Sequence, residues 1–181
     1  MQKYLSKIQP QVGNAWRTDE VYVKVRGNMK YLFALMDDET RYWISQQVAD
    51  HKRTSDIRPM FRDAQRIAGK KPKAIISDGA MNFAEATTNV FWDVNLKRKD
   101  QVKHIRDITF DGERHNNKQE RFNGEFRDRE KVIRGVKSAD SPLFQGAQIY
   151  HNFIKPHIAL GEKTPAELAG IVVKGQIAGR L

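Results

Sequence analysis

Apolar residues first recur with the spacing of β-strands and later also with the spacing of helices, and this order limits the folds that the chain can adopt. Residues 15–25 (AWRTDEVYVKV) alternate between two kinds of side chain, which predicts a strand with one buried face. Residues 30–36 are almost wholly apolar, and residues 42–49 also have the composition of a strand. Because Gly27-Asn28 is a typical hairpin turn and no helical pattern intervenes, we expect these three strands to form an antiparallel meander.

The later part of the chain alternates between helical and strand patterns. Apolar residues recur at helical spacing over residues 55–68, with Ser55 as the expected cap and Gly69 as the expected end. The remaining segments predict a strand at 73–77, a helix ending near Trp92, a strand at 102–108, helices at 117–134 and 143–154, and a last helix capped by Thr164. Strands separated by helices favour parallel pairing, so we expect an α/β fold with a mixed five-stranded sheet flanked by helices.

The charge of the chain favours a polyanionic partner. Lys plus Arg number 32 against 22 Asp plus Glu, a net charge of +10, so nucleic acid is the first candidate and an anionic membrane surface the second. No apolar stretch is long enough to span a bilayer, and the N-terminus lacks the apolar core of a signal peptide. We therefore expect no membrane association and a cytoplasmic, nucleoid-associated protein. The lack of cysteine excludes disulfides, cysteine–zinc sites and cysteine nucleophiles within this chain.

Two aspartates occupy unusual positions in the expected sheet. Asp19 shares a strand face with Val21 and Val23, where an ionised carboxylate costs several kcal/mol unless it is paired or binds a metal. Asp78 follows the strand at 73–77, and ligands of such sheets gather at the C-terminal ends of strands. Each also has a structural interpretation, Asp19 as a hydrogen-bonded residue at the sheet rim and Asp78 as part of an Asp-Gly turn.

A third acid, Glu120, lies near the start of the helix expected at 117–134. It has the spacing of a capping residue, yet Gly124 one turn later leaves the surface beside it open. Three carboxylates without cysteine suit Mg²⁺ or Mn²⁺ better than zinc. With a basic surface, they point to two-metal phosphodiester chemistry.

Basic residues cluster in three places. Each cluster could be a solvated surface or a site of contact with phosphates. Arg58, Arg62 and Arg66 repeat every four residues and form one stripe along a helix. Since the excess of positive charge flanks the proposed metal site, we expect these clusters to contact DNA phosphates. The candidates are Arg58, Arg62, Arg66, Lys97, Arg98, Lys118, Arg121 and Arg127.

Four motifs together resemble a known family of enzymes. They are WRTDEVYVKVRGNMKYLFALMD (16–37), IISDG (75–79), HNNKQERFNGEFRDREKVIRG (115–135) and YHNFIKPHIALGEKTPAELAGI (150–171). They resemble the catalytic core of insertion-sequence transposases of the DDE class, in the retroviral integrase superfamily with its ribonuclease H-like fold. The resemblance covers residues 15–171 and implies that Asp19, Asp78 and Glu120 form the catalytic triad.

The resemblance also implies a reaction and its partners. The expected function is metal-dependent DNA strand cleavage and strand transfer, with two Mg²⁺ (or Mn²⁺) ions held by the triad when DNA is bound. The expected partners are transposon ends, target DNA and further copies of the chain, as a dimer or larger homo-oligomer assembled on DNA. The alternatives are a ribonuclease H-like nuclease that only hydrolyses and an inactive, domesticated DNA-binding module.

The chain departs from the family pattern in two ways. Glu120 lies 42 positions after Asp78, which is longer than is usual, whereas Glu113 lies 35 positions after it and is the rival third acid. We prefer Glu120 because the residues around it match the motif. Residues 1–14 are too short for the usual DNA-binding module, so we expect a linker helix or remnant there, a tail at 172–181, and a core fragment or truncated copy overall.

The histidines near the C-terminal end of the chain invite a catalytic interpretation. Tyr150 and Ile154 continue an apolar stripe begun by Leu143 and Ala147, so we expect the helix at 143–154 to pack on the core through these residues. His151 and His157 are accordingly expected to be structural.

Overall fold

The computed structural model describes residues 9–106, 124 and 136–171. Its elements are β1 (Ala15–Val25), β2 (Asn28–Asp37), β3 (Trp43–Ala49), α2 (Thr54–Ala68), β4 (Ala74–Ser77), α3 (Met81–Phe91), η1 (Arg98–Asp100), β5 (Lys103–Arg106), α5 (Pro142–Ile149), η2 (Tyr150–Ile154), η3 (Ile158–Leu160) and α6 (Pro165–Leu168). None of the helices in these ranges is long and apolar enough to cross a membrane. The segments 1–8 and 172–181, and the helix expected at 117–134 apart from Gly124, lie outside the described residues.

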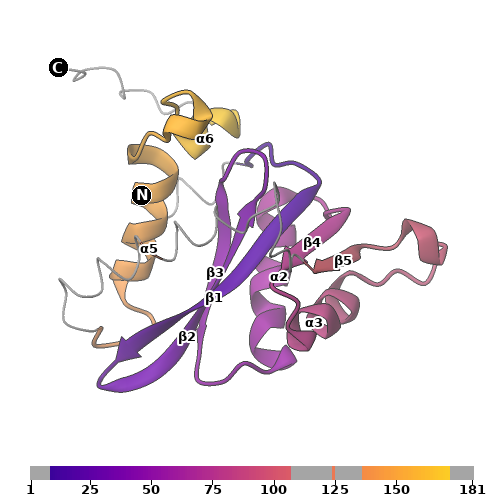
Figure 1. Cartoon of the computed structure of the whole chain (residues 1–181), viewed down its shortest axis with the longest axis horizontal. Coiled ribbons are helices and arrows are strands. Elements are labelled where there is room, and N and C mark those ends of the chain that lie inside the picture. The colour runs from indigo at the N-terminus through magenta and orange to yellow at the C-terminus, as the bar shows by residue number, and fades with distance from the viewer. Residues whose placement is uncertain (1–8, 107–123, 125–135, 172–181) are drawn as a thin grey trace, which may run out of the picture.

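The five strands form one mixed sheet in the order β3-β2-β1-β4-β5 (Figure 1). The pairs β1–β2 and β2–β3 are antiparallel, whereas β1–β4 and β4–β5 are parallel. The meander and the parallel addition expected from the sequence are both confirmed. The hairpin turn lies at Arg26 and Gly27, with φ of 50° and 82°, one residue before the expected Gly27-Asn28.

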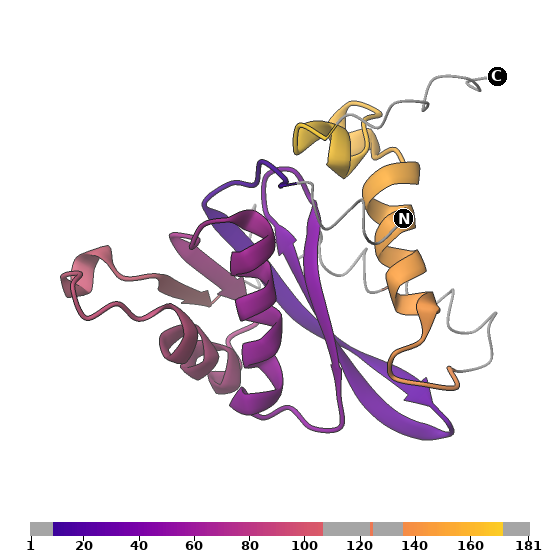
Figure 2. The same cartoon turned by 180° about the vertical axis from the view of Figure 1, so that it is seen from behind.

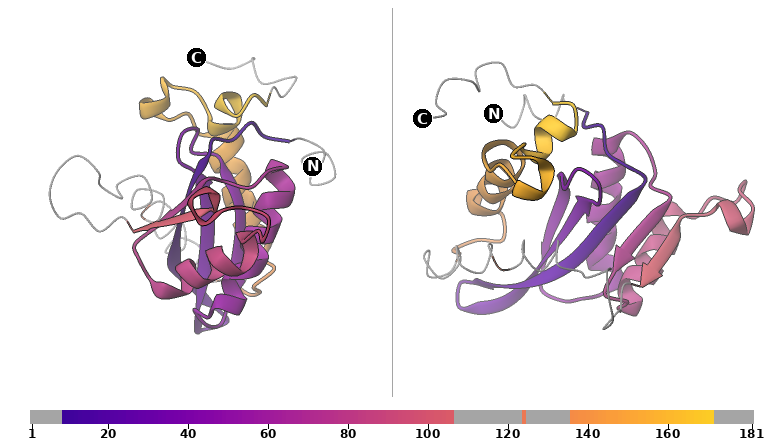
Figure 3. Two further views of the ribbon diagram at one scale, coloured as in Figure 1. Left: turned by 90° about the vertical axis from the view of Figure 1, so that its right-hand side faces the viewer. Right: turned by 45° about the horizontal axis from the view of Figure 1, so that its top comes forward.

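Helices cover both faces of the sheet (Figures 1 and 2). On one face, α2 and α3 enclose a core that includes Trp16, Phe33 and Ile75, each fully buried. On the opposite face, α5 packs through Phe144 against the valines of β1. The segment carrying η1 projects beyond the sheet edge that β5 forms (Figure 3).

The helix α2 follows from its sequence except at its start. Its apolar stripe, from Ile57 to Ala68, is buried, and Gly69 ends it with a φ of 65°. Ser55 is not the cap, because the helix begins at Thr54 and Arg53 takes the N-cap position. The carboxylate of Asp56 accepts the backbone N–H of Arg53 at 3.0 Å.

Asp37 is a fully buried carboxylate that fixes how the chain enters β1. Its Oδ1 accepts the backbone N–H of Gly13 at 2.8 Å, and its Oδ2 accepts the N–H and hydroxyl of Thr40 at 2.9 and 2.7 Å. A Cβ at Gly13 would come within 2.8 Å of the Glu39 carboxyl group, so a larger residue there would require the Glu39 side chain to shift. Residues 9–14 carry no helix, unlike the linker helix considered for 1–14.

The helical segment formed by α5 and η2 turns a different face to the core from the one expected. Tyr150 and Ile154 are 36% and 58% exposed, whereas His151 and Asn152 are buried, so the expectation for the first two was wrong. The backbone winds as a π-helix over Tyr150–Ile154, and the wider turn shifts which side chains face the sheet.

The buried residues of η2 are bound to the backbone at the start of β3. Asn152 accepts the N–H of Trp43 at 2.8 Å and donates to its carbonyl at 2.9 Å. His151 Nε2 lies 2.9 Å from the Arg41 carbonyl, so this nitrogen carries the proton that it donates. These contacts support the structural assignment of His151. The expected capping box at Thr164 is confirmed, its hydroxyl accepting from Glu167 and its N–H donating to the Glu167 carboxylate.

Candidate active site

The register of β1 and β4 brings the two aspartates to the same level of the sheet. Arg17 pairs with Ile76 in this parallel arrangement. Two residues further along each strand lie Asp19 and Asp78. Because residues in a parallel pair advance together, this register brings the backbones of the two aspartates to neighbouring positions.

Asp19 occupies the face of β1 that the sequence predicted. On this face the side chains of Val21 and Val23 are fully buried, and Asp19, which precedes them, is half-buried. Its Oδ1 accepts the backbone N–H of Glu20 at 2.8 Å. This bond fixes the orientation of one carboxylate oxygen.

Asp78 follows directly where β4 ends at Ser77, as expected. Its side chain is exposed, and Oδ1 accepts the N–H of Ala80 at 3.2 Å, so the turn interpretation also holds. Gly79 has a φ of 94°, which lets the chain turn away from the sheet at this point.

Ser77 ties this turn to the neighbouring strand. Its hydroxyl accepts the N–H of Gly79 at 3.2 Å and lies 2.9 Å from His104 Nε2 on β5. Burial, with a smaller contribution from Arg106, holds the pKa of His104 below its ordinary value. The imidazole is therefore neutral at neutral pH, and its Nε2 can accept a hydrogen bond from the serine hydroxyl.

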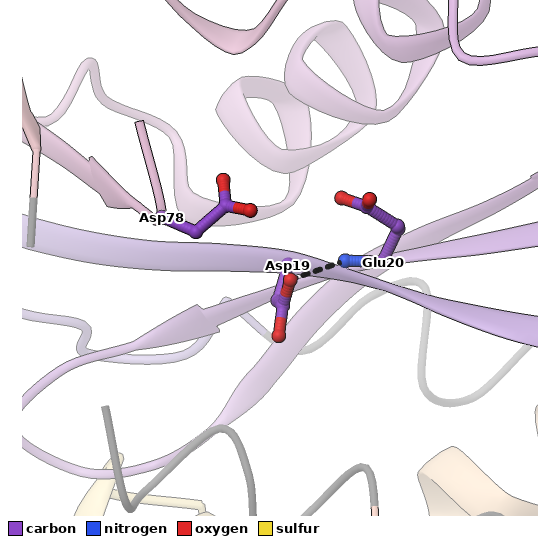
Figure 4. A group of neighbouring side chains, drawn as sticks. All are labelled: Asp19, Glu20 and Asp78. Carbon is purple, nitrogen blue, oxygen red and sulfur yellow. Dashed lines mark hydrogen bonds between the residues drawn. The ribbon is translucent and has the colours of Figure 1, made fainter. Parts of the chain in front are cut away.

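Glu20, which the sequence analysis did not select, lies close to both aspartates. One carboxylate oxygen each from Asp19, Glu20 and Asp78 lie within 4.8 Å of one another. Figure 4 shows the Glu20 and Asp78 carboxylates facing each other on one side of β1, with Asp19 on the other side. Glu20 lies on the same face of β1 as the buried Thr18. An acidic residue on that face is the sequence feature that could have identified Glu20 as part of the site.

Lys52 holds Glu20 in this position. Its ammonium group forms an ion pair with Glu20 Oε1, and the two side chains are 33% and 11% exposed. The ammonium also lies 4.9 and 5.0 Å from the ring centroids of Tyr22 and Tyr31. Although burial lowers the pKa of Lys52, its bonds to Glu20 and Tyr22 outweigh that effect and raise it, so Lys52 stays charged. Asn82 anchors the backbone by donating to the Lys52 carbonyl at 2.8 Å.

The donor set fits a hard divalent cation. It consists of carboxylate oxygens only, the ligands that Mg²⁺ and Mn²⁺ prefer. Glu20 Oε2 is buried and has no hydrogen-bond partner in the described part of the chain. A bound cation would satisfy this oxygen, which is otherwise costly to bury.

Several predicted site residues lie outside the described residues. They are Glu120, its rival Glu113, and the basic residues Lys118, Arg121 and Arg127. The structure therefore describes two of the three expected triad residues, and it brings those two together.

The described basic residues differ in their surroundings. Arg62 is exposed, Arg66 is exposed and pairs with Asp63 at 3.0 Å, and Arg58 is half-buried. Lys97 and Arg98 are exposed in the segment leading to β5. Arg106 was not among the selected contacts, yet it is exposed opposite Ser77, one residue before Asp78.

Solved structures show which fold this is. A chain from the simian T-cell lymphotropic virus intasome, in complex with PP2A regulatory subunit B56 gamma, aligns with a TM-score of 0.65 at 15% identity. That alignment covers 95% of this chain, which spans 60% of the intasome chain. The HTLV-2 integrase catalytic core domain in complex with magnesium aligns with TM-scores of 0.58 in its dimeric form and 0.59 in its trimeric form. These alignments have 14% and 17% identity and cover 89% of this chain and 98% and 99% of the respective cores.

The expected ribonuclease H-like fold of an integrase core is therefore confirmed. A search of curated protein sequences gave no match. The model of the DDE domain family matches residues 13–157, which includes the whole sheet and both aspartates. The chain therefore belongs to the DDE domain family.

Proposed function

We propose that this domain cuts DNA and joins the freed 3′ end to a second DNA, with Asp19, Asp78 and Glu120 as its catalytic residues. The observation that carries the proposal is the convergence of Asp19, within β1, and Asp78, just after the end of β4, in a DDE domain. Glu120, in a sequence that matches the family motif, is proposed as the third acid, with Glu113 as the alternative.

The residues of the site have distinct tasks in this reaction. Asp19 and Asp78 hold their carboxylates through the N–H groups of Glu20 and Ala80, so the negative charges are fixed before DNA arrives. Asp19 and Asp78 would hold a pair of Mg²⁺ or Mn²⁺ ions, which would supply the charge that stabilises the attacking and leaving oxygens of an in-line displacement. The HTLV-2 core, which shares the fold, was solved with magnesium, and this supports the choice of cation.

DNA phosphates are proposed to contact the basic residues selected above. Lys97 and Arg98 extend from a segment that the buried Gln101 holds in one conformation. Gln101 donates to the carbonyls of Asp93 and Leu96 at 2.6 and 3.0 Å, and accepts the N–H of Asp93 at 3.0 Å. Since the segment is already ordered, little conformational entropy is lost when it meets the backbone of DNA.

Removing two of these cations should weaken DNA binding and its salt dependence. We expect Lys97→Ala/Arg98→Ala to lower the slope of log K against log salt by about 1.8 if each cation meets one phosphate. Fluorescence anisotropy with a labelled duplex between low and moderate salt measures this slope. Lys24→Ala/Lys30→Ala on the β1–β2 hairpin removes the same net charge, and equal slopes for the two variants would argue against a specific contact.

The partners of the reaction belong to the same proposal. Transposon ends and target DNA are the proposed substrates, and nucleoid association follows from binding them. The integrase cores of similar fold include a dimeric form, a trimeric form and an intasome. We propose that this chain likewise assembles as a homo-oligomer on DNA.

One assay separates this function from its alternatives. A labelled donor oligonucleotide, an unlabelled target duplex and Mg²⁺ are incubated with the protein, and the products are resolved by length. Products longer than the donor indicate strand transfer and support the proposal. Shortened donor alone would identify a hydrolytic nuclease, and unchanged donor with retained binding would identify an inactive DNA-binding module.

A further inference from the structure

The acid next to Asp19 has an arrangement that an ordinary ion pair does not explain. Glu20 Oε1 is bound by Lys52, while Oε2 is buried without a hydrogen-bond partner in the described ranges. A carboxylate that served only to pair with Lys52 would turn its second oxygen to water. Here the side chain is 11% exposed and its carboxylate faces that of Asp78 (Figure 4).

We propose that Glu20 is a fourth carboxylate of the metal centre, with Lys52 as the residue that positions it. The inference rests on the proposed function and adds to the triad an acid from the opposite face of β1. Lys52 fixes Oε1 and leaves Oε2 for the cation, which would give that oxygen its missing partner.

The surroundings of Lys52 show why its position is fixed. Two tyrosine rings flank its ammonium group, and Asn82 of α3 holds its backbone carbonyl. Its stem therefore has little freedom to follow Glu20 elsewhere. The ammonium also offsets part of the repulsion between Glu20 and the two aspartates, so the acids can stay close before any cation binds.

Binding of Mn²⁺ to the full chain without DNA tests the proposal directly. Free Mn²⁺ is counted by electron paramagnetic resonance during a titration of wild type, Glu20→Gln, Asp19→Asn and Glu85→Gln. We expect Glu20→Gln to bind Mn²⁺ about ten- to a hundredfold more weakly, as is typical when a supporting acid of a metal site is removed. Glu85→Gln is the matched control, because Glu85 is an exposed glutamate outside the acid group and should leave the affinity unchanged.

A second pair of variants separates metal binding from a merely structural role. Lys52→Gln and Glu20→Gln both break the ion pair, but only the second removes the charge of Glu20. We expect Lys52→Gln, which keeps the charge of Glu20 but frees its carboxylate, to lose less affinity for Mn²⁺ than Glu20→Gln does. We expect Glu20→Asp, which keeps the charge, to restore part of the affinity.

The possible results distinguish this inference from the proposed function. Normal Mn²⁺ binding by Glu20→Gln, with weakened binding by Asp19→Asn, would overturn the role of Glu20 alone. An equal loss in Glu20→Gln and Lys52→Gln would show that the ion pair is structural and would also overturn it. Normal binding by Asp19→Asn, or no binding by wild type, would overturn the metal centre itself.

Discussion

We expect Asp19→Asn to abolish DNA strand cleavage, with a rate at least about a thousandfold below wild type, equivalent to about 4 kcal/mol of activation free energy. The amide keeps the size of the carboxylate and can still accept the N–H of Glu20, but it lacks the charge that holds a divalent cation. The labelled-oligonucleotide assay at saturating Mg²⁺ measures the effect. Thermal unfolding should show that the variant stays folded.

A neighbouring acid provides the control for this variant. Asp38 pairs with Arg17 at 3.1 Å, close to β1 but outside the group of three acids. Asp38→Asn should therefore retain cleavage. If Asp19→Asn instead lost its fold, Asp19 would be a structural residue of the sheet rim, and retained cleavage by a folded Asp19→Asn would remove it from the catalytic triad.

We expect a chain that stops before Tyr150 not to fold. It loses the two bonds of Asn152 to Trp43, the buried ring of Phe153 and the apolar contacts of α6. Two broken buried hydrogen bonds cost about 1–3 kcal/mol each and a buried Phe about 3–5, which together approach the whole stability of a domain. The soluble yield and far-ultraviolet circular dichroism of residues 1–149 check this result.

Point variants at Asn152 and Ile154 test which face of η2 contributes to the stability of the domain. We expect Asn152→Ala to lower the free energy of unfolding by about 1–3 kcal/mol, because it removes the acceptor of the buried Trp43 N–H, whereas the Trp43 carbonyl keeps its bond from Gln148. Ile154→Ala, at an exposed position of the same turn, should change it by less than about 0.5 kcal/mol. His151→Ala and His157→Ala should each retain Mg²⁺-dependent cleavage, and complete loss in a folded variant would place that histidine in the active site.

Local patterns predicted the elements whose periodicity stays regular. The bounds of β1, residues 15–25, agree with the strand expected from alternation, because one face is covered by α5 and the other becomes partly exposed beyond Glu20. The stripe of α2 was also predicted, since a helix packed on a sheet must bury every third or fourth residue.

Long-range geometry explains what the sequence could not reveal. A π-turn changes the helical phase at Tyr150, and no residue type marks it, so the buried face of that segment was assigned wrongly. Alternation placed Glu20 opposite Asp19 on β1. Its approach to Asp78 depends on where the chain leaves β4, and its orientation depends on Lys52, which lies 32 residues away.

The parallel pairing of β1 with β4 also determines when the acids meet during protein synthesis. Asp78 is made 59 residues after Asp19, about 3 to 12 seconds later at ordinary rates of translation. Until then β1 has no neighbour on its β4 side, and its backbone groups on that edge are unpaired. An unfinished chain therefore cannot assemble the acid group before β4 has been made and has paired with β1.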